Sequence, residues 1–240
     1  MLELGVNVDH VATVREARRA PYPSPLEAAR ICEEAGAWGI TAHLREDRRH
    51  VNDDDLAALS QNVKRLNMEM AATDEMVAIA RTLKPHSSCL VPEKRQELTT
   101  EGGLDVLSSP ERLRDVVASL REAGIVVSIF IDPDEVQLDA AKETGAEYVE
   151  LHTGAYANAV GEAAKTELER LIKAAEHASG IGLLVNAGHG IDYVNVSGVL
   201  EIPHLRELNI GHSIVSRAVI VGMRQAVEEM RRLMDAYPAG

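Results

Sequence analysis

Four short apolar segments of the sequence carry polar residues at every second position, of the types that transfer protons and bind anions. The segments are residues 3–10, 39–45, 66–71 and 148–154. Carboxylates and imidazoles together suit general acid–base catalysis, and a guanidinium suits a substrate phosphate. Because alternate residues of a strand face opposite sides, one side of these segments would carry Asn7, Asp9, Thr41, His43, Arg45, Asn67, Glu69, Glu150 and His152.

Two further segments end in a glycine–histidine turn, NAGHG at 186–190 and NIGHS at 209–213. Glycine lets backbone N–H groups approach an anion closely, and a helix starting after Gly211 and His212 would add a favourable dipole. One such turn is weak evidence. Two of them, at the ends of consecutive strand-like segments, predict a phosphate site.

A single polar residue in a core is more often hydrogen-bonded structure than a catalyst. Four segments with ionisable residues on the same side favour a functional pocket, because burying so many charges without a purpose is costly. A metal site is disfavoured, since Asp9 and His10 are adjacent and would face opposite sides of a regular strand. We therefore expect no metal, although candidate ligands exist in His10, His43, His50, His189 and His212.

Strand-like and helix-like segments alternate along the chain, which predicts a parallel sheet with helical crossovers. Eight such units in 240 residues favour a (β/α)8 TIM barrel with additional helices, as a single domain over residues 1–240. An open doubly wound sheet is disfavoured because no glycine-rich turn follows the first strand. The expected strands are 3–10, 39–45, 66–71, 87–93, 126–132, 148–154, 182–188 and 207–213. The expected helices are 25–36, 74–84, 110–124, 134–145, 161–179 and 214–236, with additional helical segments near 52–66, in 155–180 and near 192–200.

A barrel would bring the polar residues together. Polar sides of the strands would face the barrel interior, and apolar sides would face the helices. Catalytic residues of such barrels lie at the carboxyl ends of the strands, and phosphate often binds after the last two strands. We therefore expect one site at that mouth, with acid–base groups beside a phosphate-binding turn.

The composition excludes several classes of protein. A formal net charge of −13 argues against non-specific binding to nucleic acid or an anionic membrane. No apolar run approaches the roughly 18 residues that a spanning helix needs, and the N-terminus is not a basic signal peptide. Cys32 and Cys89 form no C-x-x-C pair, which is typical of buried thiols in a reducing compartment. We expect a cytoplasmic protein without nucleic-acid or membrane partners.

Several long segments also resemble one family closely. GVNVDHVATVREAR, GITAHLREDRRH, NMEMA, CLVPEKRQELTTEGGLD, NAGHG and ELNIGHSIVSRA, in this order, are similar to the pyridoxine 5′-phosphate synthases of vitamin B6 biosynthesis. The resemblance covers nearly the whole chain and is weakest in helical segments such as 53–65 and 155–180. It implies a TIM barrel with additional helices that assembles as a homo-octamer of dimers.

The resemblance also implies a reaction. These transferases condense 1-deoxy-D-xylulose 5-phosphate with 3-amino-2-oxopropyl phosphate, without a cofactor or metal, and release pyridoxine 5′-phosphate, phosphate and water. The catalytic set of the family falls on His43, Glu69 and His189. Contacts to the amino-ketone phosphate fall on Asn7, Arg18, Thr99, Gly190, Gly211 and His212, and contacts to deoxyxylulose phosphate fall on Asp9, His10, Arg45 and His50.

Residue types and resemblance together suggest individual roles. We expect Glu69 to be the principal general base and acid, with His43 polarising a carbonyl or relaying protons and His189 protonating a leaving hydroxyl. Arg45 and His50 would bind the phosphate that leaves, and Arg18 and Thr99 would contact the other substrate. The four charges at 46–49 are expected to pair with one another or with a neighbouring subunit.

Two other functions remain alternatives. An aldolase or epimerase that handles phosphorylated substrates could use the same barrel, but a Schiff-base aldolase needs a lysine inside it. No expected strand ends in one, and Lys94 lies in a loop. The second alternative is a non-catalytic protein that binds sugar phosphates without consuming them.

Overall fold

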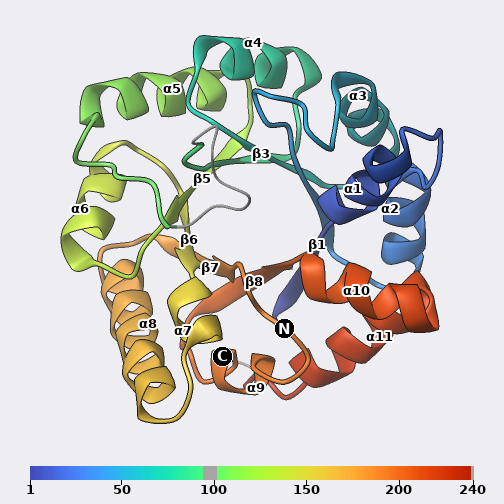
Figure 1. Ribbon diagram of the computed structural model, residues 1–240. Coiled ribbons are helices and arrows are strands. Elements are labelled where there is room, and N and C mark those ends of the chain that lie inside the picture. Colours follow the sequence, from blue (N-terminus) through green and yellow to red (C-terminus); the bar gives the residue numbers. More distant parts are fainter. Residues whose placement is uncertain (94–101, 239–240) are drawn as a thin grey trace.

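Eight parallel strands form the centre of the fold. The computed structural model describes residues 1–93 and 102–238. Its strands close into a barrel in chain order, with β1 between β8 and β2 (Figure 1). They are β1 (Glu3–Asn7), β2 (Gly39–His43), β3 (Leu66–Met70), β4 (Ser87–Leu90), β5 (Val126–Ile131), β6 (Tyr148–His152), β7 (Leu184–Gly188) and β8 (Leu205–Ile210). The predicted TIM barrel is confirmed, and each predicted strand overlaps an observed one.

Helices surround the barrel on all sides (Figure 1). Several have side-chain caps at their N-termini: for example, Thr73 accepts a hydrogen bond from the N–H of Met76, and Asn52 and Asp55 form a capping box. In the described residues the helices are α1 (Asp9–Arg18), α2 (Pro25–Glu34), α3 (Asp53–Asn62), α4 (Asp74–Leu83), α5 (Pro110–Glu122), α6 (Glu135–Glu143), α7 (Gly154–Asn158), α8 (Glu162–Gly180), α9 (Val196–Val199), α10 (His212–Val221) and α11 (Met223–Met234).

Two parts of the sequence prediction were wrong in detail. The first strand was expected to continue to residue 10, but β1 ends at Asn7 and Asp9 begins α1, a helix that was not predicted. The helix expected over 214–236 is two helices, α10 and α11. Gly222 separates them with φ +86°, a conformation that interrupts an α-helix and that glycine adopts without steric cost.

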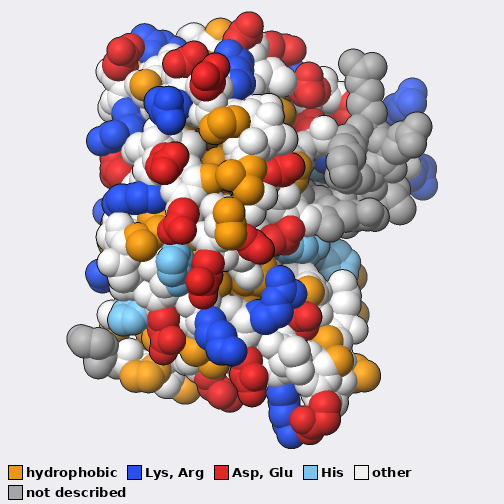
Figure 2. Space-filling model, turned by 90° about the vertical axis from the view of Figure 1, so that its left-hand side faces the viewer, with side chains coloured by type: hydrophobic (Ala, Val, Ile, Leu, Met, Phe, Trp, Pro, Cys, Tyr) orange, Lys and Arg blue, Asp and Glu red, His pale blue; other side chains and the backbone are white. Residues whose placement is uncertain are grey.

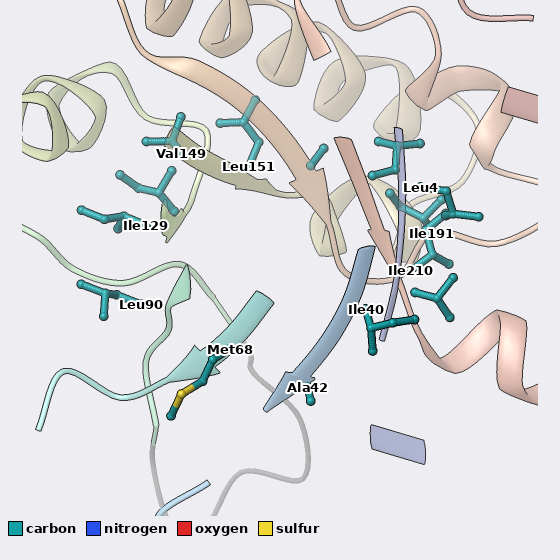
Figure 3. Packing of buried hydrophobic residues seen from close by; sticks show 14 of the residues in the cluster. Leu4, Ile40, Ala42, Met68, Leu90, Ile129, Val149, Leu151, Ile191 and Ile210 are labelled. Carbon is teal, nitrogen blue, oxygen red and sulfur yellow. The ribbon is translucent and has the colours of Figure 1, made fainter. Parts of the chain in front are cut away.

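The apolar sides of the strands form the core between barrel and helices. Ile40 and Ala42 on β2 and Met68 on β3 are fully buried. Figure 3 shows their side chains outside the ring of strands, on the side of the helices. The alternation predicted for these strands is thus confirmed, and it directs the polar residues of the same strands into the barrel.

The outer surface over α5, α6 and α8 carries acidic and basic side chains interspersed with a few hydrophobic ones (Figure 2). Within residues 1–93 and 102–238, none of the helices has the length and hydropathy needed to cross a membrane.

Candidate active site

A cavity of about 660 Å³ opens at the carboxyl ends of the strands. Eleven of the thirteen site residues that the sequence suggested line it, including all three proposed catalytic groups. They are Asn7, Asp9, His10, His43, Arg45, His50, Glu69, His189, Gly190, Gly211 and His212. Arg18, at the end of α1, is not among the described residues that line this cavity, and Thr99 lies outside the described residues.

The first two residues of α1, Asp9 and His10, supply one carboxyl group and one imidazole. Because Asp9 and His10 lie in a helical turn, both side chains line the cavity, and the expectation that they face opposite sides was wrong. Asp9 is buried and accepts hydrogen bonds from the backbone N–H of His43 (2.9 Å) and from the Asn7 amide (2.9 Å). Asp9 therefore ties β1 and α1 to the end of β2.

His43 and Glu69 are opposite each other on neighbouring strands β2 and β3. His43 Nδ1 lies 3.9 Å from Glu69 Oε2, while its Nε2 lies 2.8 Å from Oε1 of Glu93. Glu93 also accepts a hydrogen bond from the N–H of Glu46 (3.0 Å). Burial alone would raise the pKa of Glu93, but the hydrogen bond and charge of His43, the N–H of Glu46 and the charge of Arg45 together lower it. The ionised Glu93 therefore favours hydrogen on Nε2 of His43 and leaves Nδ1 directed at Glu69.

Glu69 lies among other acids. Burial, and then the charges of Asp9 and Glu150, raise its pKa well above the usual range, while a hydrogen bond from Asn7 opposes the shift. Its side chain retains 16% exposure, so it can still meet a ligand in the cavity. A carboxyl group with a raised pKa can both donate and accept a proton near neutral pH.

Glu150 lies deeper in the barrel and lines the same cavity. Burial, followed by the charge of Glu207, raises its pKa to about 8, although the Asn209 amide donates a 2.7 Å hydrogen bond to it. Glu150 thus belongs to the same group of buried, mutually repelling carboxyl groups as Glu69. It was recognised in the sequence as an inward residue of β6 but was not assigned to the site.

His189 follows β7, on the wall of the cavity opposite β2 and β3. Its φ of +77° is unusual for a residue with a side chain. Burial, with smaller contributions from the charges of His152 and His10, lowers its pKa to about 4. His189 is therefore a neutral imidazole at physiological pH.

The N-termini of α1 and α10 lie at one end of the cavity. Gly211 precedes α10, and a Cβ there would lie 2.9 Å from Cβ of Asn7, so only glycine fits without movement. The rings of His10 and His212 stand edge to face with their centroids 5.0 Å apart. His10 Nδ1 is buried without a hydrogen-bond partner in the described residues. The starts of α1 and α10, with their helix dipoles, and the two imidazoles together suit an anion.

The other end of the cavity is formed by the loop after β2. Arg45 is buried, and its Nε lies 3.4 Å from Asp47. His50 accepts a 2.8 Å hydrogen bond from the N–H of Val51 on its Nδ1, which places hydrogen on Nε2 of the neutral ring. This end thus combines a guanidinium with an N–H donor.

The remaining loop charges pair only in part as expected, because Arg48 contacts acids outside residues 46–49. Arg49 forms an ion pair with Asp47 (2.6 Å), and Arg48 contacts Asp53 (2.9 Å) and Glu75 of α4 (2.6 Å). Arg49 also lines the cavity, which the sequence reading did not anticipate. Its contribution to the positive charge of this wall was therefore missed.

Three of these side chains could in principle hold a metal ion. Asp9, His43 and Glu69 each offer a ligand atom, and these atoms lie within 4.8 Å of one another. Asp9 and His43 are already engaged with Asn7, the backbone and Glu93. The expectation that no metal takes part in the chemistry stays a prediction.

A second polar cavity, of about 440 Å³, lies at the amino ends of the strands. Its lining includes Glu3, Arg65, Arg206 and Glu207, and it shares Glu150 with the first cavity. Burial, and then the charge of Glu3, raise the pKa of Glu207 to about 7, against the opposing charge of Arg65. The barrel interior is thus polar from one mouth to the other.

Comparison with known proteins gives a consistent result. Residues 4–236 match the model of a family described as pyridoxal phosphate biosynthesis protein PdxJ. The chain is 59% identical to pyridoxine 5′-phosphate synthase of Synechococcus sp. (strain JA-2-3B'a(2-13)), over 98% of this chain and 99% of that protein. It is 58% identical to pyridoxine 5′-phosphate synthase of Idiomarina loihiensis, over 98% of each.

Solved structures with the same fold are much more distant in sequence. Thiamine phosphate pyrophosphorylase from Pyrococcus furiosus is 17% identical, with a TM-score of 0.63 over 99% of this chain and 98% of that one. Phosphoribosyl anthranilate isomerase from Thermus thermophilus is 13% identical, with a TM-score of 0.63 over 99% and 100%. At such identities the likeness concerns the barrel alone.

Proposed function

Because the chain belongs to the PdxJ family of pyridoxal phosphate biosynthesis proteins, we propose that the cavity at the carboxyl ends of its strands is where its reaction takes place. The chain is a transferase that condenses 1-deoxy-D-xylulose 5-phosphate with 3-amino-2-oxopropyl phosphate to pyridoxine 5′-phosphate, phosphate and water. The observation that carries the assignment of the site is the facing pair His43 and Glu69, 3.9 Å apart between two anion-suited ends of one cavity.

The proposed proton transfers follow from the tautomers and pKa shifts of three side chains. Imine formation, dehydration and ring closure each move a proton, and Glu69 can supply and recover it because its raised pKa allows both forms. His43 presents Nδ1 to Glu69 and carries hydrogen on Nε2, which suits a relay. His189, neutral because its pKa is about 4, can orient a leaving hydroxyl through a hydrogen bond, while the protonation falls to Glu69.

The two ends of the cavity would bind the two phosphates. We assign the phosphate that leaves to Arg45 and His50, with Asp9 and His10 contacting the deoxyxylulose part, because this wall holds a guanidinium and an Nε2–H donor. The retained phosphate would lie by Gly190, Gly211 and His212, with Asn7 beside it. Contacts from Arg18 and Thr99 stay predictions.

The decisive experiment is incubation of the purified protein with both substrates. We expect the pyridoxine chromophore to form, with one phosphate released for each product molecule. Consumption of either substrate alone would favour an aldolase or epimerase, and binding without consumption would favour a sensor.

An aldolase mechanism has a separate test. None of the described residues that line the cavity is a lysine. Borohydride added in the presence of substrate should therefore leave the mass of the protein unchanged, whereas a lysine adduct would contradict the proposed chemistry.

Assembly and location complete the proposal. We propose a homo-octamer, which is supported by exposed apolar side chains on neighbouring helices, Val14 on α1 and Val219 and Ile220 on α10. Light scattering after gel filtration tests this. We also propose a cytoplasmic location, supported by the acidic composition and two unpaired, buried cysteines.

A further inference from the structure

A histidine–aspartate pair lies on the wall of the barrel beside the cavity. His152 ends β6 and is buried, and its Nδ1 lies 2.9 Å from Oδ1 of Asp132, which follows β5. Asp132 also accepts a hydrogen bond from the backbone N–H of Gly103. Its hydrogen bond with His152 is the largest cause that lowers the pKa of Asp132. The carboxylate is therefore ionised and fixes hydrogen on Nδ1 of His152.

The imidazole of His152 contacts the imidazole of His189. Their ring centroids are 5.1 Å apart at 67°, and Phe130, the single phenylalanine of the chain, lies 5.1 Å from His152 and 6.4 Å from His189. Gly154 leaves room for both rings, because a Cβ there would lie 2.4 Å from Nε2 of His152 and 3.2 Å from Cδ2 of His189. The ring of His189 thus has a packed wall on the side of β6.

The backbone of His189 is held by the same segment. The Thr153 hydroxyl, fully buried, contacts the carbonyl oxygens of Gly188 (2.8 Å) and His189 (2.5 Å), and the Thr153 N–H donates to Gly188 (3.0 Å). A left-handed backbone at a residue with a side chain persists only where surrounding contacts impose it. Residues 152–154 therefore determine both the backbone and the ring position of His189.

We propose that His152, anchored by Asp132, is a positioning residue that orients His189 toward the cavity during the synthase reaction. The inference rests on the role of His189 proposed above. His152 is not among the residues that line the cavity in the described chain, so it acts through His189 rather than on substrate. A ring fixed on one side by a hydrogen-bonded neighbour is pre-organised for proton transfer.

The charged groups around His189 determine how its pKa should change when His152 is replaced. His189 faces His152 from β6 and His10 from α1, and Asp132 is also near Arg170 of α8. The charge of His152 is one cause of the low pKa of His189. Removing His152 should therefore allow His189 to titrate at a higher pH than in the wild type.

The test uses His152→Phe, which keeps a ring and removes the link to Asp132. We expect kcat to fall about tenfold, with the dissociation constants of both substrates within about twofold of wild type. The His189 resonances, followed by NMR in histidine-labelled protein, should titrate at higher pH. An unchanged kcat would overturn the proposal. A lower kcat with unchanged His189 titration would overturn it as well, since that result indicates loss of packing only.

Two variants of Asp132 test the same hydrogen bond in case His152→Phe does not fold. The Asp132 side chain is half exposed, so Asp132→Ala and Asp132→Asn are expected to fold. Alanine removes the acceptor and should reproduce most of the loss in kcat, whereas asparagine keeps an acceptor oxygen and should restore much of it. Equal effects of the two would contradict positioning through this hydrogen bond.

A matched control exists on the outside of the barrel. His177 of α8 forms the same kind of pair with Asp139 of α6, at 2.8 Å, away from the cavity. His177→Phe should change neither kcat nor the titration of His189, and an equal effect would overturn the specific role of His152. Substrate binding and His189 titration do not require turnover, so failure of this inference is distinguishable from failure of the proposed function.

Discussion

The barrel has a polar cavity at each end, and the two resemble each other in several respects. Each contains carboxyl groups whose pKa burial raises, Glu69 at one end and Glu207 at the other, and each contains arginines. They differ in what surrounds these groups. The end at the carboxyl termini of the strands adds five imidazoles, glycine turns and the first residues of two helices, while the lining of the other end includes one imidazole, that of His86.

The difference teaches that buried acids alone do not identify an active site. At the amino ends Glu3 and Glu207 face Arg65 and Arg206 close to the start of the strands. At the carboxyl ends the acids lie beside histidines, helix N-termini and glycine turns. In the described residues, the second arrangement places acids and several imidazoles beside helix N-termini and glycine turns, which agrees with the location of catalysis in barrels of this kind.

The strongest test of the difference is Glu69→Gln. We expect kcat to fall about 10³-fold, because the amide cannot exchange a proton while its shape is conserved. Product formation is measured with both substrates saturating, and circular dichroism and Tm serve as controls for folding. Near-normal turnover would show that Glu69 is not the principal acid and base.

A smaller loss is expected for Glu93→Ala, which removes the acceptor of His43 Nε2. Loss of a charge-assisted hydrogen bond is worth about 1.5–3 kcal/mol, so kcat should fall by about 10-fold to 100-fold. Glu93→Gln keeps an oxygen acceptor and should lose less. Equal activity of both variants and wild type would indicate that His43 needs no such partner.

His50→Ala separates binding from chemistry at the same end. The expected result is about a tenfold weaker affinity for deoxyxylulose phosphate, since one donor to its phosphate is lost, and a much smaller change for the amino-ketone substrate. Isothermal titration with each substrate measures this. Unchanged affinity for the first substrate would remove His50 from the phosphate site.

At the other end, Glu207→Gln should leave kcat within about twofold of wild type and alter stability instead. The folded pKa of Glu207, about 7, is raised above the value of 4.5 for an exposed glutamate, so the folded state binds the proton more tightly. Wild-type stability should therefore decrease as pH rises from about 4.5 to 7, by on the order of 3 kcal/mol from this group, and the variant should lose this slope.

Urea unfolding at several pH values measures the slope. A large fall in kcat for Glu207→Gln would contradict the contrast between the two ends, because it would place catalysis on Glu207 as well.

The smallest effect is expected from a chelator. Dialysis against a strong chelator should leave turnover unchanged, since Asp9 and His43 are engaged in hydrogen bonds that a metal ion would have to displace. A loss of activity that zinc restores would instead assign a metal to Asp9, His43 and Glu69.

Much of the site was accessible from the sequence because strand geometry is local. The alternation in 39–45 predicted that His43 and Arg45 share one side and that Ile40 and Ala42 share the other, and both hold. The start of α1 was missed because Val6 and Val8 continue the alternation of β1 up to Asp9. That pattern does not distinguish a strand from a helix that begins within it.

Partners distant in the chain could not be found in this way. Nothing in the local pattern indicates that Glu93 contacts His43, 50 residues earlier, or that Asp132 contacts His152. The raised pKa of Glu69 likewise depends on its burial and on the charges of Asp9 and Glu150, which exist around it only when the barrel closes.

The sequence by itself determined the barrel and its polar interior, because hydrophobic periodicity and residue type are properties of short segments. The resemblance of its long segments to one family named most of the residues that line the proposed site. Tertiary structure alone decided which nitrogen of His43 faces Glu69, why His189 is neutral, and which of two polar cavities has the groups for catalysis. Those properties depend on distances, burial and charge between strands, and such quantities exist only after the chain has closed on itself.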